Sequence, residues 1–302
     1  MRPSIFSDDN PLAQFALTIL TCLSCLFLFV SVGSFFSFIL FHIHPKDLQT
    51  ELTNLQNIEL QKFFQMVQAI GLFIVPPLIL GKVFSGNSAN YLYLNKKPFG
   101  YQFALVVIVV LVSIPVINLI AGLNAMIKFP ESMSGIQHYI DQTSKTYQTL
   151  SESFMKVQTL QGLAVNLLII AIVPAIGEEF LFRGVFQRIF SNWTRNPHWG
   201  IFISAFIFSA IHFEFYGFFP RLILGMMFGY FLYWSGSIWL PILAHFVNNG
   251  IAVITYYLIS SGRLNEKMAD IGSTSEILPI TISCCIFMGA GIYYLYKKRV
   301  NT

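Results

Sequence analysis

Long runs of apolar residues, separated by short polar segments, dominate the pattern along this chain. A run of about 18 or more apolar residues is long enough to cross a bilayer as a helix. Candidate runs occupy residues 12–42, 63–81, 102–122, 162–190, 199–213, 220–235, 237–258 and 277–296. The pattern predicts an all-α protein, a polytopic membrane helical bundle of about eight transmembrane helices. The fifth and sixth runs are short and could form a re-entrant pair, which would leave six or seven full crossings.

One segment between the long runs has a different period. From residue 133 to 160, apolar side chains recur at three- and four-residue steps, at Met133, Ile136, Ile140, Tyr147, Leu150, Phe154 and Val157. This spacing predicts an amphipathic helix. We interpret it as an interfacial helix that leads into the run at 162–190. The alternative is a lid or substrate guide beside a site.

The composition agrees with a membrane location. Of the 302 residues, 55% are hydrophobic and only 11% are charged, and the mean hydropathy is +0.65. This balance is typical of polytopic membrane proteins, with membrane lipid as an expected partner. No loop between the runs is long enough to bury a core of its own, so residues 1–302 are expected to form a single membrane domain. The first run is too long for a signal-peptide core, and we interpret it as a retained helix.

The distribution of charged residues predicts how the protein is oriented in the membrane. With eight crossings, both termini lie on one side together with the loop at 82–101, and the basic residues there include Lys96, Lys97 and those at 297–299. An excess of Lys and Arg marks cytoplasmic segments, so both termini are expected in the cytoplasm. The formal net charge of +4 suits basic ends beside a membrane. It gives no indication of a nucleic-acid partner, and none is expected.

Three ionisable residues, Glu178, Glu179 and Arg183, interrupt the apolar run at 162–190. Each charge at the centre of a bilayer costs about 2.5 to 3.5 kcal/mol, so these side chains are expected to face a protein interior or a wet cavity. Glu179 and Arg183 are four residues apart and can form an ion pair on one helix face. Glu178 points about 100° away around the helix axis, so this ion pair does not account for its charge inside the membrane. Pro174, four residues earlier, is expected to disturb the helix and to free a carbonyl near residue 170.

Two further polar sets lie in apolar runs: His212 near the end of one, and His245 with Asn249 in another. A lone histidine in a membrane helix is usually a hydrogen-bonding residue between helices. At about 1.5 Å per residue, however, Glu178, His212, His245 and Asn249 lie at comparable depths from helix ends on the same predicted side. We therefore expect these four residues to meet in one cavity.

The chemistry of this set suits hydrolysis of an amide. A carboxylate with a neighbouring imidazole can hold a water molecule and take its proton. A second imidazole and an amide N–H can donate to the oxyanion that forms when the water attacks a carbonyl. Glu178, His212 and His245 could instead hold a divalent metal ion as a two-histidine, one-carboxylate set. The sequence does not separate these two mechanisms.

Taken in order, these residues resemble the signatures of the CPBP intramembrane proteases. That family includes the Ras-converting CAAX endopeptidases and bacteriocin-processing and self-immunity proteins. Glu178, Glu179 and Arg183 form the EExxxR pattern, residues 208–212 form FxxxH, and residues 245–249 form HxxxN. The resemblance covers residues 162–258, a third of the chain, which would be the catalytic core.

The resemblance implies an eight-helix endopeptidase in the cytoplasmic membrane of a bacterium, with its site open to the cytosol. Glu178 with His212 would activate water, and His245 with Asn249 would stabilise the oxyanion. The ion pair on the helix of Glu178 would hold that carboxylate in place. The favoured mechanism requires no cofactor, and a divalent metal such as zinc is the alternative. The substrate would be a peptide or protein of the membrane, prenylated or unmodified.

Two other classes of function remain open. A non-catalytic immunity or scaffold protein could keep the same polar residues as a structural network and bind a peptide. Such a protein would keep its function after the change Glu178→Gln, whereas a protease would lose it. A proton-coupled transporter could use Glu178 and the histidines as a relay. The sequence lacks the paired interrupted helices and internal similarity that transporters often show.

Overall fold

The computed structural model describes residues 10–54, 56–265 and 278–299, and the regular elements in these ranges are all helices. They are α1 (Pro11–Phe41), α2 (Leu48–Thr53), α3 (Ile58–Ala69), α4 (Val75–Ser85), α5 (Ser88–Tyr91), α6 (Gly100–Ala125), α7 (Ser134–Met155), α8 (Leu160–Asn166), α9 (Val173–Glu179), α10 (Gln187–Thr194), α11 (Pro197–Ala210), α12 (Phe218–Ser235), α13 (Trp239–Ser260) and α14 (Leu278–Lys297). The π-helical turns η1 (Ile70–Ile74), η3 (Leu167–Ile172) and η4 (Phe180–Phe186) join α3 to α4 and α8 through α10 into continuous helices, and η2 (Glu131–Met133) is a short 3₁₀ turn. The predicted all-α bundle is confirmed.

A helix lies within each of the eight predicted apolar runs. Six helices of the described chain are long and apolar enough to cross a membrane, and they span residues 11–41, 58–85, 100–125, 160–194, 239–260 and 278–297. The run predicted at 199–213 forms α11, which is only 14 residues long. The run predicted at 220–235 forms α12, with 18 residues. The protein is therefore a polytopic membrane bundle, and the count of eight full crossings stays a prediction.

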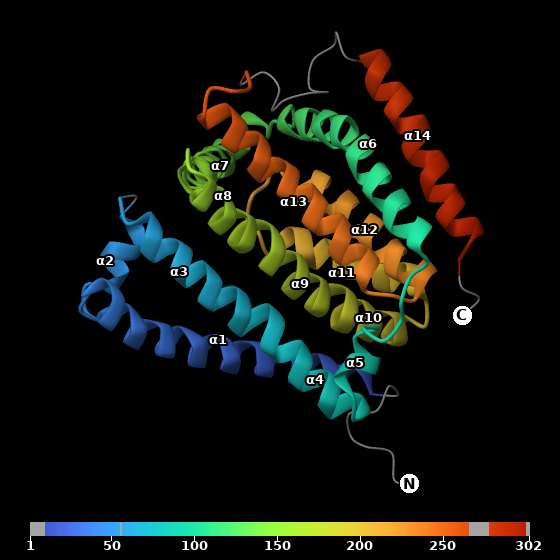
Figure 1. Cartoon of the computed structure of the whole chain (residues 1–302), viewed down its shortest axis with the longest axis horizontal. Helices are drawn as coiled ribbons and strands as arrows, with labels where there is room; N and C mark the ends of the chain where they lie inside the picture. Colours follow the sequence, from blue (N-terminus) through green and yellow to red (C-terminus); the bar gives the residue numbers. More distant parts are fainter. Residues whose placement is uncertain (1–9, 55, 266–277, 300–302) are drawn as a thin grey trace.

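The long helix from α8 to α10 runs through the middle of the bundle (Figure 1). Helices α11, α12 and α13 pack on one side of it, and α1 with α3 and α4 on the other. Helix α14 packs along α6 at the outer edge. The apolar core follows η4 and α10, where Phe182, Val185 and Ile189 are almost completely buried. The middle helix thus supplies both the core and the charged residues of the sequence motif.

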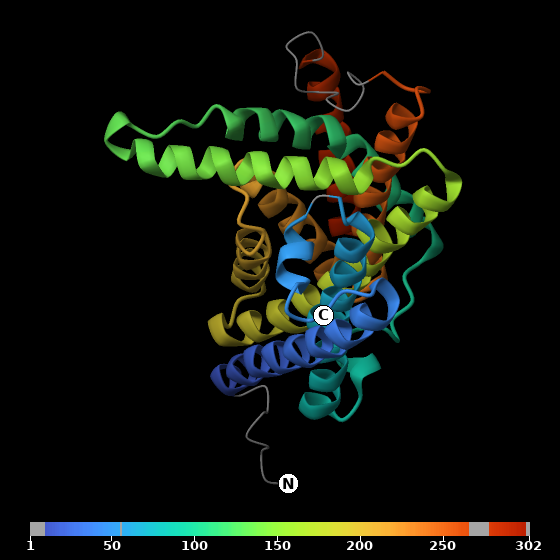
Figure 2. The same cartoon turned by 90° about the vertical axis from the view of Figure 1, so that its left-hand side faces the viewer.

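The predicted amphipathic helix is α7. Figure 1 shows it end-on and Figure 2 along its length, so it runs across the ends of the neighbouring helices. It is anchored to the loop between α11 and α12, because Gln137 Nε2 donates to the Tyr216 hydroxyl at 2.9 Å and that hydroxyl donates to Asp141 Oδ1 at 2.6 Å. The hydrogen bond to Asp141 raises the pKa of Tyr216. Ser144 Oγ adds a bond to Glu214 Oε1 at 3.2 Å. Helix α7 therefore covers the loop that carries His212.

Two of the π-helical turns come directly before prolines. Turn η1 precedes Pro76 and Pro77, and η3 precedes Pro174. Proline has no N–H to donate and its ring meets the carbonyl four residues earlier, so a widened turn accommodates it. The disturbance predicted at Pro174 is confirmed. The two widened helices meet at Gly177, where an added Cβ would lie 2.8 Å from Phe73 Cβ, so only glycine allows this approach.

Candidate active site

Glu179 is the centre of a buried network of charges. Its Oε1 accepts hydrogen bonds from Arg183 Nη1 at 2.9 Å and from His245 Nδ1 at 2.8 Å. The side chains of Glu179 and Arg183 are 0% and 1% exposed. The structure thus contains the predicted ion pair, with His245 of α13 as a further partner. Burial of Glu179 and Arg183 is tolerated because the two charges pair through a hydrogen bond. The other oxygen of Glu179, Oε2, is buried and accepts no hydrogen bond from the described residues.

Arg183 ties the middle helix to two others. Its Nη2 donates to the carbonyl oxygen of Gly225 in α12 at 3.1 Å. Its guanidinium lies 4.7 Å from the ring centre of Phe208 in α11 and 5.5 Å from that of Phe228 in α12. A cation over desolvated aromatic rings adds to the attraction. The arginine therefore holds α11 and α12 against the middle helix.

Glu178 and His245 face each other across the edge of this network. The Glu179 carboxylate only accepts hydrogen bonds, so His245 Nδ1 carries the proton, and its Nε2 lies 3.8 Å from Glu178 Oε2. The His245 ring also stacks on Phe228, with ring centres 5.5 Å apart. The Glu178 side chain is 15% exposed. The two neighbouring glutamates thus point in different directions, as helix geometry predicts.

His212 is held in one tautomer by its own backbone. Its Nδ1 lies 2.8 Å from the carbonyl oxygen of Phe208, and because a carbonyl cannot donate, Nδ1 carries the hydrogen. In the neutral ring, Nε2 is then left with a free lone pair. The loop around His212 is fixed by the Glu214 carboxylate, which accepts from the backbone N–H groups of Tyr216 at 2.9 Å and Gly217 at 2.6 Å.

Asn249 binds the backbone carbonyl of Ile170, which lacks a helical donor because of Pro174. Its Nδ2 donates to the oxygen of Ile170 at 3.0 Å, and its Oδ1 accepts from Asn248 Nδ2 at 3.1 Å. Ile170 is four residues before Pro174, so its carbonyl has lost its usual helical donor. The predicted free carbonyl near residue 170 is confirmed. One N–H of Asn249 is therefore structural, and the second is left for a ligand.

The four residues predicted to meet do border one cavity. It has a volume of about 540 Å³, and its walls include Glu178, His212, His245 and Asn249. Glu179 and Arg183 are not part of that wall. The cavity lies among membrane helices, yet its lining combines a carboxylate, two imidazoles and an amide. A polar, partly enclosed site of this kind can hold a water molecule next to a bound carbonyl group.

Several residues of this cavity were missed by the sequence analysis. Arg221, at the start of α12, borders it and pairs with Glu214 through Nη2 and Oε2 at 2.9 Å. Its position near the end of an apolar run makes it look like an ordinary interfacial arginine. Gln65 of α3 also lines the cavity. Tyr147 of α7 does so too, and the sequence pattern indicated it only as part of the amphipathic helix that could be a lid or substrate guide. For Gln65, only the spacing of the glutamines along α3 could have indicated a place in the cavity wall.

The predicted metal alternative lacks a ready ligand set. Within residues 10–54, 56–265 and 278–299, no three His, Cys, Asp or Glu side chains lie close enough together to hold an ion. The metal alternative at Glu178, His212 and His245 stays a prediction. In both histidines a hydrogen bond at Nδ1 leaves Nε2 available, an arrangement that serves a water molecule as well.

Part of the chain is similar to known proteins. Residues 160–251 match the family model described as type II CAAX prenyl endopeptidase Rce1-like. Over 90 residues the chain is 27% identical to the uncharacterized protein YpbD of Bacillus subtilis strain 168, which covers 28% of this chain and 43% of that protein. No solved structure matches the chain. The family match contains all three motifs, from Glu178 to Asn249.

Proposed function

We propose that this integral membrane protein is an endopeptidase that hydrolyses a peptide bond of a membrane-associated substrate, because residues 160–251 match the family model of the Rce1-like CAAX prenyl endopeptidases. One observation carries the proposal. Glu178, His212, His245 and Asn249 come from three separate parts of the chain and border the same cavity. A structural network alone would not require these polar groups to open onto a space large enough for a ligand.

Glu178 and His212 would activate the attacking water. The Glu178 carboxylate borders the cavity, and His212 offers a lone pair at Nε2. A water molecule held between them would pass its proton to Glu178 as its oxygen attacks the peptide carbonyl. Glu178 would then pass that proton to the leaving amine. The hydrolysis is complete when the C–N bond breaks, with the water oxygen in the new carboxylate.

His245 and Asn249 would stabilise the oxyanion. A protonated His245 would donate from Nε2 into the cavity, since its Nδ1 is bound to Glu179. The second N–H of Asn249 would donate beside it. Preorganised donors of this kind lower the barrier to acyl transfer.

The finer properties of the substrate belong to the same proposal. The description of the family model names a prenyl endopeptidase, so a prenylated protein is one candidate substrate and an unmodified membrane peptide is another. We place the enzyme in the cytoplasmic membrane of a bacterium, with its cavity open to the cytosol. The alternative is a non-catalytic protein that binds a peptide in the same cavity.

Cleavage of peptides in ¹⁸O-labelled water tests the proposal. The purified protein in detergent is mixed with a library of prenylated and unmodified peptides, and mass spectrometry follows the products. We expect fragments with one ¹⁸O atom in the new carboxyl group. Glu59→Gln, a matched change of an exposed carboxylate on α3, should give the same fragments, and Glu178→Gln should give none. A well-folded protein without any cuts would favour the peptide-binding alternative.

The metal alternative has its own test. In the proposed mechanism, dialysis against a zinc chelator leaves the cleavage rate unchanged. A loss of activity that added zinc restores would overturn this part of the proposal and assign a metal to the cavity.

A further inference from the structure

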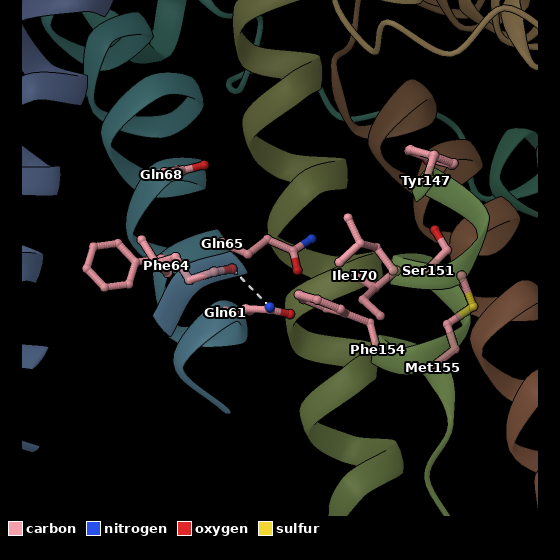
Figure 3. A pocket seen from close by; sticks show the side chains of 11 residues that line it. Gln61, Phe64, Gln65, Gln68, Tyr147, Ser151, Phe154, Met155 and Ile170 are labelled. Atoms are coloured by element: carbon pink, nitrogen blue, oxygen red, sulfur yellow. Dashed lines mark hydrogen bonds between the residues drawn. The ribbon is translucent and has the colours of Figure 1, made fainter. Parts of the chain in front are cut away.

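A second pocket lies directly beside the candidate active site. It has a volume of about 480 Å³ and lies between α3, α7 and the middle helix (Figure 3). Gln65, Tyr147, Met155 and Ile170 line both this pocket and the cavity of Glu178. The two spaces therefore share a wall, and a chain that enters one can continue into the other.

The amide of Gln61 has a fixed orientation in this pocket. Its Nε2 donates to the carbonyl oxygens of Leu52 at 3.0 Å and Asn54 at 3.1 Å. Since both partners can only accept, the nitrogen is assigned to that side, and Oε1 must point the other way. Figure 3 shows this oxygen directed toward the side of Phe154. Gln61 is only 7% exposed, and Oε1 is buried without a partner among the described residues.

Gln65 presents a second buried amide oxygen in the same pocket. Its Oε1 is also buried and accepts no hydrogen bond from the described residues. Residues 61 and 65 are one turn apart and lie on the same face of α3, so both amides point into the pocket (Figure 3). A buried acceptor without a donor destabilises a fold. Two such acceptors in one pocket indicate a ligand that supplies two donors.

The spacing of the two amides matches an extended peptide. Four residues of an α-helix rise about 6 Å along the axis. In an extended chain, backbone N–H groups on the same side recur every two residues, about 6.6 Å apart. The remaining walls are mainly apolar, with Phe64, Phe154 and Ile170 among them. The pocket thus offers two acceptors at the interval of a strand, together with apolar surface for its side chains.

We propose that this pocket binds an extended, apolar segment of the peptide substrate, and that Gln61 and Gln65 accept hydrogen bonds from alternate backbone N–H groups of that segment. Gln65 lies where the pocket and the catalytic cavity share a wall, so the segment leads toward the scissile bond. This assignment rests on the proposed peptidase function. It makes the protein selective for substrates that are unfolded near the cut.

The first test compares Gln65→Met with a matched control. Methionine keeps the length of the side chain and removes the acceptor, while Gln148→Met makes the same change on the exposed side of α7. We expect Gln65→Met to raise KM about threefold to tenfold, the loss expected for one hydrogen bond, with kcat within a factor of two. Gln148→Met should leave both constants unchanged. An unchanged KM in Gln65→Met would overturn the assignment.

The second test locates the bond on the substrate. A series of peptides is made in which an ester replaces one backbone amide at a time, which removes one N–H. Wild-type protein should show a raised KM for esters at two positions that are two residues apart. One of these effects should vanish in Gln65→Met and the other in Gln61→Met. If the variants respond to every ester as the wild type does, the glutamines do not hold the backbone.

Binding without turnover separates this inference from the proposed function. In the Glu178→Gln background, a fluorescent peptide should bind about threefold to tenfold more weakly when Gln65→Met is added. Cleavage by the wild-type protein with no such difference in binding would contradict the role of Gln65 and leave the peptidase intact. Absence of cleavage together with this difference would contradict the peptidase and leave a peptide-binding pocket.

Discussion

Helix α1 and the middle helix from α8 to α10 are both long, apolar and interrupted by polar residues, yet they use those residues differently. Helix α1 buries a narrow stripe that includes Thr18, Cys22 and Ser37, and it exposes large side chains such as Phe27 and Phe35. In the middle helix, every residue from 179 to 187 is buried. The first helix has a face for lipid, and the second is enclosed by protein along residues 179–187.

The difference lies in where the polar groups find their partners. In α1, Thr18 Oγ1 donates to the carbonyl oxygen of Gln14 at 2.7 Å, and Ser37 Oγ donates to that of Ser34 at 2.8 Å, so both hydroxyls bond within their own helix. In the middle helix, Glu179 and Arg183 also bond to α13 and α12. Polar residues of the first kind permit close contact between helices. Those of the second kind determine which helices meet.

The largest effect is expected from Arg183→Ala. This change leaves Glu179 without its guanidinium partner inside the membrane, and removing one member of a buried ion pair costs about 3 to 5 kcal/mol. Thermal unfolding in detergent should show a strong loss of stability, and the yield of folded protein should fall. Arg263→Ala, at an exposed position, is the matched control. A variant as stable as the wild type would contradict the importance of the network.

His245→Ala should lower the reaction rate. If His245 donates to the oxyanion, its loss should reduce kcat about 10²- to 10³-fold, as for other donors of this kind. Cleavage kinetics measure this effect, and His138→Ala on the exposed side of α7 serves as the control. A change in kcat of less than threefold would remove His245 from this role.

Pro174 and Asn249 should show coupled effects on stability. With alanine at 174, the new N–H can donate to the carbonyl of Ile170, which now depends on Asn249. The change Asn249→Ala should therefore cost about 1 kcal/mol less in a Pro174→Ala background than in the wild type, the value of about one hydrogen bond. Unfolding of both single variants and the double variant gives this difference. Strictly additive effects would show that the two residues act separately.

The smallest effect is expected in α1, from Thr18→Val. The hydroxyl is completely buried but bonds only within its own helix. Valine keeps the shape and leaves the Gln14 carbonyl with its helical donor, so the expected loss is about 1 kcal/mol or less. Thermal unfolding beside Arg183→Ala measures the contrast between the two helices. A loss as large as that of Arg183→Ala would mean that α1 also depends on its polar stripe.

The sequence predicted what depends on local spacing. Apolar runs gave the helices, and four-residue spacing gave the pair of Glu179 and Arg183. Proline has no N–H to donate to the carbonyl four residues earlier, and this indicated a carbonyl without a helical donor near residue 170. The comparable depths of Glu178 and His245 in separate helices were enough to predict that both border one cavity.

Contacts between distant helices could not be predicted in this way. Nothing in the spacing of residues shows that His245 shares Glu179 with Arg183, because that contact depends on the crossing of α9 and α13. Tyr147 and Gln65 join the site only because α7 and α3 pack against the middle helix. The length of α11 was also beyond the pattern, so the number of crossings and the orientation of the protein in the membrane stay predictions.

The central claim is that two adjacent glutamates have separate tasks, with Glu178 in the chemistry and Glu179 in the fold. The most direct measurement is the turnover of one identified peptide, together with the melting temperature, for Glu178→Gln and Glu179→Gln. We expect Glu178→Gln to lose at least about 10² of the rate at an unchanged melting temperature, and Glu179→Gln to melt at a lower temperature than the wild type. Wild-type turnover in Glu178→Gln, or the same behaviour in both variants, would contradict the claim.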